Sequence, residues 1–268
     1  MLSENRIREL LAERGVSGEL VFYDEVDSTN ERAREYARSH RDNAAGEGKD
    51  TVIFLATSQS AGRGRRGRSF LSEEGGIYLS LLIYPREDVA VEKITAEAAV
   101  RAASAIEAVT GLDIGIKWVN DLYINGKKCA GILTEGEFDE NGNLRYYVLG
   151  LGINVYKIDG FSDKMPIATT LEDEIKKKNN SHGDALDVPD INTIAKEIIC
   201  ALLSPEAPTL YDYRRRCIIL DKKIIVKRGS DEFFATAKEI LPDYSLLVEL
   251  DEGKTFTLNS GEVTTVIS

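Results

Sequence analysis

The chain is organised around the stretch Thr57-Ser58-Gln59-Ser60-Ala61-Gly62-Arg63-Gly64-Arg65-Arg66-Gly67-Arg68-Ser69-Phe70, which is rich in glycine and arginine. Residues 51–56 before it and residues 77–83 after it are apolar and strand-like, which predicts a loop between two strands. Glycine lets the backbone approach a ligand closely, and arginine binds carboxylate or phosphate through paired hydrogen bonds. The stretch therefore predicts a cationic loop that closes over a small anion.

An exposed basic turn and an arginine–glycine segment that contacts RNA are the alternative interpretations of this loop. The chain as a whole is acidic, because it holds 34 Lys and Arg against 45 Asp and Glu, a formal net charge of −11. A protein that binds nucleic acid through its overall charge is usually basic. We therefore predict a local anion site and no nucleic-acid partner, although the loop alone does not name the ligand.

Length and composition are those of a globular protein, with 268 residues of which 43% are hydrophobic and 29% charged. Such a length fits one large domain with a small one. No stretch reaches the ~20 apolar residues that cross a bilayer, and the charged start does not resemble a signal peptide. We expect no membrane partner and a cytoplasmic location. Cys129, Cys200 and Cys217 are too widely spaced to suggest disulfides or a zinc site, and the two histidines lie in polar surroundings.

The part of the chain before residue 216 is predicted to contain both helices and strands. Helical patterns cover residues 3–14, 32–39, 92–109 and 191–203, strands are expected at 20–23, 51–57 and 77–83, and residues 172–189 are expected to be polar and flexible. Asn125-Gly126 between apolar runs predicts a hairpin within an antiparallel meander over residues 114–155. The turns of this meander should bring Asn120, Asp121 and Lys128 together. From residue 217 onward, short apolar runs with tight turns predict a small barrel, so we place a domain boundary near Arg216.

The segment Asp27-Ser28-Thr29-Asn30-Glu31 has two compatible interpretations. Ser28 and Glu31 fit a capping box at the start of the following helix. Thr29, Asn30 and the free amides of a helix start can also present hydroxyl and N–H groups to a polar ligand.

The lysines and the carboxylate of the meander suit a nucleotide. Lys117 and Lys128 can neutralise a phosphate under attack, while Asp121 helps hold Mg²⁺ on phosphate oxygens. Lys117 alternates with apolar neighbours, so a lysine that faces solvent is equally consistent with the pattern. Trp118, the only tryptophan, is either a stacking surface or part of the core.

Six segments in order resemble the motifs of biotin protein ligases. Gln59 to Arg68 matches their GRGRRGR loop, Asp27 to Asn30 their DSTN segment, residues 117–122 KWPND, residues 126–133 (R/K)KLAGIL, residues 152–155 GIN-V and residues 260–263 SGEV. Order and spacing agree over nearly the whole chain. Val119 stands in place of the motif's proline, and Phe70 stands where tryptophan is common.

The resemblance implies an α+β fold, in which a mixed β-sheet catalytic domain with flanking helices (residues 1–216) precedes an SH3-like barrel (residues 217–268). It implies that the enzyme uses ATP and Mg²⁺ to activate biotin as biotinyl-5′-AMP. The biotinyl group would then pass to one lysine of a biotin carboxyl carrier domain. A homodimer is one assembly that the resemblance allows. In the absence of an N-terminal DNA-binding module we expect no repressor role.

The same resemblance implies roles for individual residues. Lys128, Arg63 and Lys117 would be catalytic, and Asp121 would bind Mg²⁺. The substrate-binding residues would be Ser28, Thr29, Asn30, Gln59, Gly62, Arg63, Gly64, Arg65, Arg68, Trp118, Asn120, Lys128, Gly131 and Gly152. Two other functions stay open from the sequence: a lipoate ligase or acyltransferase with the same catalytic fold, and a small-anion or RNA-binding protein without catalysis.

Overall fold

A seven-stranded mixed sheet forms the body of the larger part of the chain. The computed structural model describes residues 1–16, 18–40, 51–85, 90–158, 160–182, 186–228, 231–259 and 262–265. The strands are β1 (Glu19–Val26), β2 (Thr51–Gln59), β3 (Gly76–Ile83), β4 (Gly115–Lys117), β5 (Asp121–Ile124), β6 (Lys127–Phe138) and β7 (Leu144–Asn154), in the spatial order β1-β2-β3-β7-β6-β5-β4. The pair β1–β2 is parallel and the other pairs are antiparallel. The expected mixed sheet is thus confirmed.

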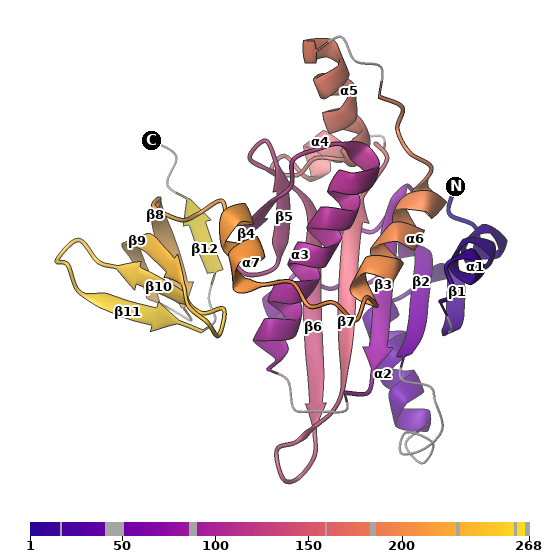
Figure 1. Cartoon of the computed structure of the whole chain (residues 1–268), viewed down its shortest axis with the longest axis horizontal. Coiled ribbons are helices and arrows are strands. Elements are labelled where there is room, and N and C mark those ends of the chain that lie inside the picture. Colours follow the sequence, from indigo (N-terminus) through magenta and orange to yellow (C-terminus); the bar gives the residue numbers. More distant parts are fainter. Residues whose placement is uncertain are drawn as a thin grey trace.

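Helices cover both faces of this sheet. They are α1 (Glu4–Glu13), α2 (Thr29–Ser39), α3 (Val91–Thr110), α4 (Phe161–Lys164), α5 (Leu171–His182), α6 (Ile191–Leu202) and α7 (Leu210–Arg216). Figure 1 shows α3 and α6 side by side across one face, and α2 lies on the other. Alternation along β2 explains this layering, because successive side chains of a strand point to opposite faces. Ile53 and Leu55 join the main core, whereas Val52 and Phe54 pack against Ala33 and Ala37 of α2.

Two predicted turns are confirmed by their backbone angles. Gly111 ends α3 with φ +64°, a left-handed conformation that glycine adopts without steric cost. Asn125 and Gly126 have φ +49° and +78° and connect β5 to β6 as the expected hairpin. This turn brings β5 and β6 into their antiparallel pairing.

The expectation of a flexible segment over residues 172–189 is wrong for α5. This helix is polar in sequence, yet Leu171 and Ile175 are fully buried, and an ion pair joins Lys176 to Glu172. Helix α7 was not predicted either. Thr209 caps it, since its side chain accepts from the amide of Asp212 while the Asp212 carboxylate accepts from the amide of Thr209.

The C-terminal residues form a second, antiparallel sheet. Its strands are β8 (Lys223–Arg228), β9 (Asp231–Ile240), β10 (Leu246–Glu249), β11 (Thr255–Leu258) and β12 (Glu262–Thr265), in the order β11-β10-β9-β8-β12. No pairing within the described ranges joins β11 to β12, so this sheet is open. Residues 218–220, the first of the short apolar runs from which the barrel strands were predicted, form a turn. Ser260 and Gly261 of the SGEV segment lie outside the described residues.

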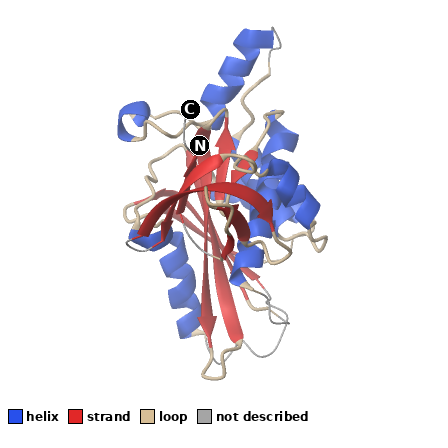
Figure 2. Cartoon of the chain, turned by 90° about the vertical axis from the view of Figure 1, so that its left-hand side faces the viewer, coloured by secondary structure: helices blue, strands red, loops and turns tan. Residues whose placement is uncertain are grey.

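The second sheet sits beside α7 and β4 (Figure 1), and in Figure 2 it is the sheet that faces the viewer. The indole N–H of Trp118 donates to the carbonyl oxygen of Tyr244 at 2.8 Å, and the amide of Ile218 donates to the carbonyl of Ile116 at 2.9 Å. Tyr213 of α7 is fully buried and its ring packs against that of Tyr244. Its hydroxyl donates to the carbonyl of Val119 at 3.2 Å. Residues 116–119, which lead into Asn120, are therefore fixed by hydrogen bonds with α7 and with the C-terminal residues. Among the described helices, none combines the length and the apolar character that a membrane crossing needs.

Candidate active site

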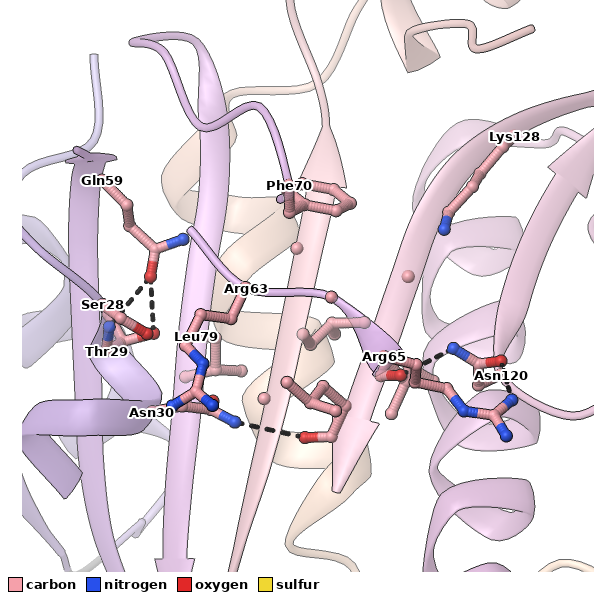
Figure 3. A pocket seen from close by; sticks show the side chains of 17 residues that line it. Ser28, Thr29, Asn30, Gln59, Arg63, Arg65, Phe70, Leu79, Asn120 and Lys128 are labelled. Carbon is pink, nitrogen blue, oxygen red and sulfur yellow. Dashed lines mark hydrogen bonds between the residues drawn. The ribbon is translucent and has the colours of Figure 1, made fainter. Parts of the chain in front are cut away.

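A pocket of about 480 Å³ opens above the centre of the seven-stranded sheet (Figure 3). The residues that line it come from the start of α2, the end of β2 with the glycine–arginine loop, strand β3, the turn between β4 and β5, and strands β6 and β7. They are Ser28, Thr29, Asn30, Gln59, Arg63, Gly64, Arg65, Phe70, Leu79, Asn120, Lys128, Gly131, Ile132, Leu133, Gly150, Leu151 and Gly152. Six segments of the chain therefore contribute to one cavity.

Glycines make the floor of the pocket. Gly131 of β6 pairs with Gly152 of β7, and Gly150 lies two residues earlier on β7. A Cβ atom at Gly152 would stand 2.6 Å from the ring of Phe70, and one at Gly150 would stand 2.1 Å from Oδ1 of Asn30. The lack of side chains at these positions lets Phe70 and Asn30 approach the sheet and leaves room above it.

The polar end of the pocket is built on the start of α2. The backbone amide and the hydroxyl oxygen of Thr29 lie 2.9 and 3.1 Å from Oε1 of Gln59, and Nε2 of Gln59 donates to Ser72 Oγ at 2.9 Å. The capping box that the sequence predicts does not form. Ser28 makes no side-chain cap to α2, and its own amide donates to Oδ1 of Asp27 instead of to Glu31.

Glu31, the other member of the expected box, belongs to an arginine cluster. Its carboxylate pairs with Arg34 and, at 3.0 Å, with Arg63 of the loop. The hydrogen bond from Arg34 lowers the pKa of Glu31; burial opposes the shift, and the charge of Arg63 adds to it. The carboxylate thus stays ionised and holds the loop arginine at the pocket.

The glycine–arginine loop is tied down at several points. Arg65 donates to Oδ1 of Asn120 at 2.8 Å, and Arg66 donates to the carbonyl of Lys227 in β8 at 3.3 Å. Within the loop, the amide of Phe70 donates to the carbonyl of Gly62 at 2.8 Å. A Cβ at Gly62 would stand 2.4 Å from the Phe70 carbonyl oxygen, so glycine is required there by close packing.

Lys128 reaches the pocket from β6. Its ammonium nitrogen lies 2.7 Å from Oδ1 of Asp121 and 5.8 Å from the centroid of the Phe70 ring. The backbone of Lys128 is fixed on the other side by hydrogen bonds with Ile167 and Thr169. The predicted neighbourhood of Asn120, Asp121 and Lys128 is confirmed.

Some predicted site residues do not line the pocket. Gly62 and Arg68 belong to the loop itself, and Asp121 stands behind Lys128. Lys117 lies on β4, with its ammonium 5.5 Å from the centroid of the Tyr123 ring. Trp118 is only 4% exposed and packs in the core, so of its two interpretations the core is the one that the structure shows.

Six lining residues were not predicted as site residues: Phe70, which was noted only as a departure from the motif, Leu79, Ile132, Leu133, Gly150 and Leu151. Glycine recurs at positions 131, 150 and 152, on two strands that are neighbours in the sheet. From this pattern the floor of the pocket could have been predicted. Within the described ranges no group of three or more His, Cys, Asp and Glu side chains could hold a metal ion by itself.

Comparison with known proteins supports the expected family. Residues 25–154 match the model of the Biotin/lipoate A/B protein ligase family. The resemblance to biotin protein ligases is confirmed. Over 188 residues the chain is 39% identical to the bifunctional ligase/repressor BirA of Bacillus spizizenii, which covers 68% of this chain and 55% of that protein. The chain thus spans about half the length of this relative.

Two further biotin protein ligases match along most of the chain. The biotin–[acetyl-CoA-carboxylase] ligase of Mycobacterium tuberculosis is 26% identical over 283 residues, covering 98% of both chains. The structure of the biotin protein ligase from Aquifex aeolicus in complex with biotin and ATP superposes with a TM-score of 0.68 at 24% identity, over 93% of this chain and 99% of that one. This last likeness is evidence for the shared α+β fold.

Proposed function

We propose that this protein is a biotin protein ligase, which activates biotin with ATP as biotinyl-5′-AMP and transfers the biotinyl group to a lysine of a biotin carboxyl carrier domain. The observation that carries the proposal is the meeting of Arg63, Arg65 and Lys128 at a single pocket with a polar end and a glycine floor. The relatives named as biotin ligases support the same activity.

The two ends of the pocket suit the two parts of the acyl adenylate. Ser28, Thr29, Asn30 and Gln59 would bind the polar ring system of biotin, with Gly131 and Gly152 beneath it. Lys128 would contact the biotin carboxylate and the α-phosphate. Attack on phosphorus depends mainly on positioning and charge neutralisation, which a lysine and arginines supply.

The remaining predicted residues would act around this centre. Asp121 offers one carboxylate, which fits Mg²⁺ because this ion is usually held by one or two carboxylates together with substrate phosphates. Asn120 would place Arg65 through the hydrogen bond between their side chains. Lys117 would approach the nucleotide from β4, and Gly62, Gly64 and Arg68 would shape the loop. For Trp118 we propose a structural role, because its indole holds the C-terminal sheet.

The division into a catalytic domain (residues 1–216) and an SH3-like barrel (residues 217–268) is also a proposal. The change from a mixed sheet with helices to an antiparallel sheet after α7 supports the boundary. A cytoplasmic location, a homodimer and the lack of a nucleic-acid partner stay predictions from the sequence.

Transfer of labelled biotin tests the function directly. The purified chain, ATP, Mg²⁺ and a biotin carboxyl carrier domain should yield labelled carrier, and a carrier with its acceptor lysine changed to arginine should stay unlabelled. Lipoate in place of biotin distinguishes the lipoate ligase alternative. If neither acid is incorporated and no pyrophosphate is released, the ligase function is wrong and the binding-protein alternative remains.

A further inference from the structure

A chain of hydrogen bonds runs beneath the polar end of the pocket and ends on a carboxylate. Oε2 of Glu135 accepts from Nδ2 of Asn30 at 2.9 Å, and Oδ1 of Asn30 accepts from the hydroxyl of Ser80 at 2.6 Å. The oxygens of Ser80 and Thr29 lie 2.7 Å apart. Neither Glu135 nor Ser80 lines the pocket, yet both contact residues that do.

The partners of Asn30 allow only one direction for its side-chain amide. Its NH₂ group faces two acceptors, the carboxylate of Glu135 and, at 3.4 Å, the carbonyl of Leu133 (the latter drawn in Figure 3). An ionised carboxylate and a backbone carbonyl accept but never donate. A reversed amide would set three oxygens against one another in a site where Asn30 is only 5% exposed.

Because the NH₂ group of Asn30 is directed at Glu135, its carbonyl oxygen Oδ1 is kept on the side of the pocket. Oδ1 lies against the floor at Gly150, where a Cβ would stand 2.1 Å away, and Asn30 lines the pocket. A carbonyl oxygen has two acceptor sites, of which Ser80 uses one. The second is left for a donor on the ligand.

Glu135 is itself held in one orientation by cations. Its Oε1 atom lies 3.2 Å from NH1 of Arg34 and 3.7 Å from NH2 of Arg63. The two arginines occupy one carboxylate oxygen and leave the other for Asn30. The side chain of Glu135 is 21% exposed, so these contacts are partly shielded from water.

We propose that Glu135 is a positioning residue for the acid substrate: it fixes the amide of Asn30 so that the pocket presents a hydrogen-bond acceptor to an N–H group of biotin. The inference rests on the proposed function, since it takes biotin as the ligand. Glutamine is the informative replacement, because it keeps the shape of Glu135 but turns one oxygen into an NH₂ group. Whichever way that amide points, its NH₂ meets either the arginines or the NH₂ of Asn30, so the direction of Asn30 is no longer fixed.

Calorimetric titration of biotin into the whole chain tests this proposal. Glu135→Gln should weaken biotin binding by up to about tenfold, as expected when a hydrogen bond between neutral groups is lost, while the protein stays folded in a thermal melt and its affinity for ATP, measured without biotin, is unchanged. Glu137→Gln, two residues further on the same strand, is the matched control and should bind biotin as the unmutated chain does. If Glu135→Gln binds biotin normally while the unmutated chain also binds it, the inference is wrong and the proposed function stands. If the unmutated chain binds no biotin, the proposed function fails, and the inference with it.

A double-mutant comparison separates positioning of Asn30 from an effect on the loop. In an Asn30→Ala background, Glu135→Gln should cause no further loss of biotin affinity, because the group it positions is gone. An additive loss, or a loss that vanishes only in an Arg63→Ala background, would overturn the proposal. Ser80→Ala provides a second variant that leaves the charge cluster intact. It should also weaken biotin binding, and its effect should likewise disappear without Asn30.

Discussion

The ammonium nitrogen of Lys128 lies 2.7 Å from Oδ1 of Asp121, and the side chains of both residues are 24% exposed. The pair joins neighbouring strands β5 and β6, so the hairpin at Asn125-Gly126 sets it. Asp121 balances the lysine charge while no anion is present. A phosphate group that enters the pocket competes for the same ammonium, which leaves the carboxylate available to a cation on that phosphate.

Replacement of Lys128 by alanine should therefore abolish most of the adenylation activity. Removal of one donor that stabilises a developing charge typically lowers the rate by roughly 10²–10³-fold. Pyrophosphate release from biotin, ATP and Mg²⁺ without carrier measures the step, and a thermal melt checks the fold. Lys127→Ala, an exposed neighbour on the same strand, is the control. Release at the unmutated rate would exclude the proposed role of Lys128.

Arg63→Ala should let the adenylate escape faster. Arg63 is held at the pocket by Glu31 at 3.0 Å, so its removal takes away an anchor of the loop and, under the proposed function, a cation beside the acyl phosphate. Loss of one or two kcal/mol corresponds to about 5- to 30-fold faster release. Dilution of preformed labelled biotinyl-AMP complex into unlabelled biotin measures the rate. Arg145→Ala, an exposed arginine of β7, should leave it unchanged, and equal rates for the two variants would contradict the prediction.

Trp118→Phe should lower stability and leave nucleotide affinity unchanged. The indole is buried and donates to the carbonyl of Tyr244, so phenylalanine loses volume and leaves that carbonyl without this donor. The free energy of unfolding should fall by about 1–3 kcal/mol, as measured by urea denaturation. A stacking role for Trp118 predicts the opposite pattern, namely weaker ATP binding with normal stability.

The sequence correctly predicted the turns whose conformation depends on their own residues. Gly111 and Asn125-Gly126 ended a helix and formed a hairpin as expected, because their positive φ angles depend on the residues themselves. The capping box did not form, because the carboxylate of Glu31 binds Arg63, 32 positions later in the chain, while the amide of Ser28 donates to Asp27. The location of Trp118 was undecided for the same reason, since its partner lies 126 positions away.

Glu135 and α5 show a related limit. The role inferred for Glu135 depends on contacts with Asn30 and Arg34, which lie about a hundred residues earlier in the chain. The polar sequence of α5 concealed a buried carboxylate, Glu174, which accepts hydrogen bonds from its near neighbours Thr169 and Lys177 and from Asn125, 49 positions earlier. Neither feature has a local pattern from which it can be recognised.

Glu174 should make stability fall at acidic pH. Burial raises its pKa, but hydrogen bonds from Lys177, Thr169 and Asn125 outweigh burial and set the pKa below the ordinary value of 4.5. A carboxyl group with a lower pKa in the folded state stabilises the fold above the unfolded-state pKa and loses this contribution as the pH falls through the folded-state pKa. Urea denaturation between pH 7 and pH 3 should therefore show a decline that Glu174→Gln reduces. Glu13→Gln, an exposed control, should keep the full decline, and a Glu174→Gln profile of the same slope would contradict the prediction.

Gly152→Ala should close the floor of the pocket. The new methyl group would lie 2.6 Å from the Phe70 ring, closer than two carbon atoms can approach, so the ring must move into the space above the sheet. We expect at least tenfold weaker biotin binding by calorimetry, with the fold retained in a thermal melt. Gly18→Ala is the matched control, because its nearest neighbour would be 3.6 Å away and its φ is not positive. The double variant Gly152→Ala with Phe70→Leu should regain part of the affinity, since the smaller side chain restores the space. Normal binding by Gly152→Ala alone would mean that Phe70 does not rest on this floor when the ligand binds.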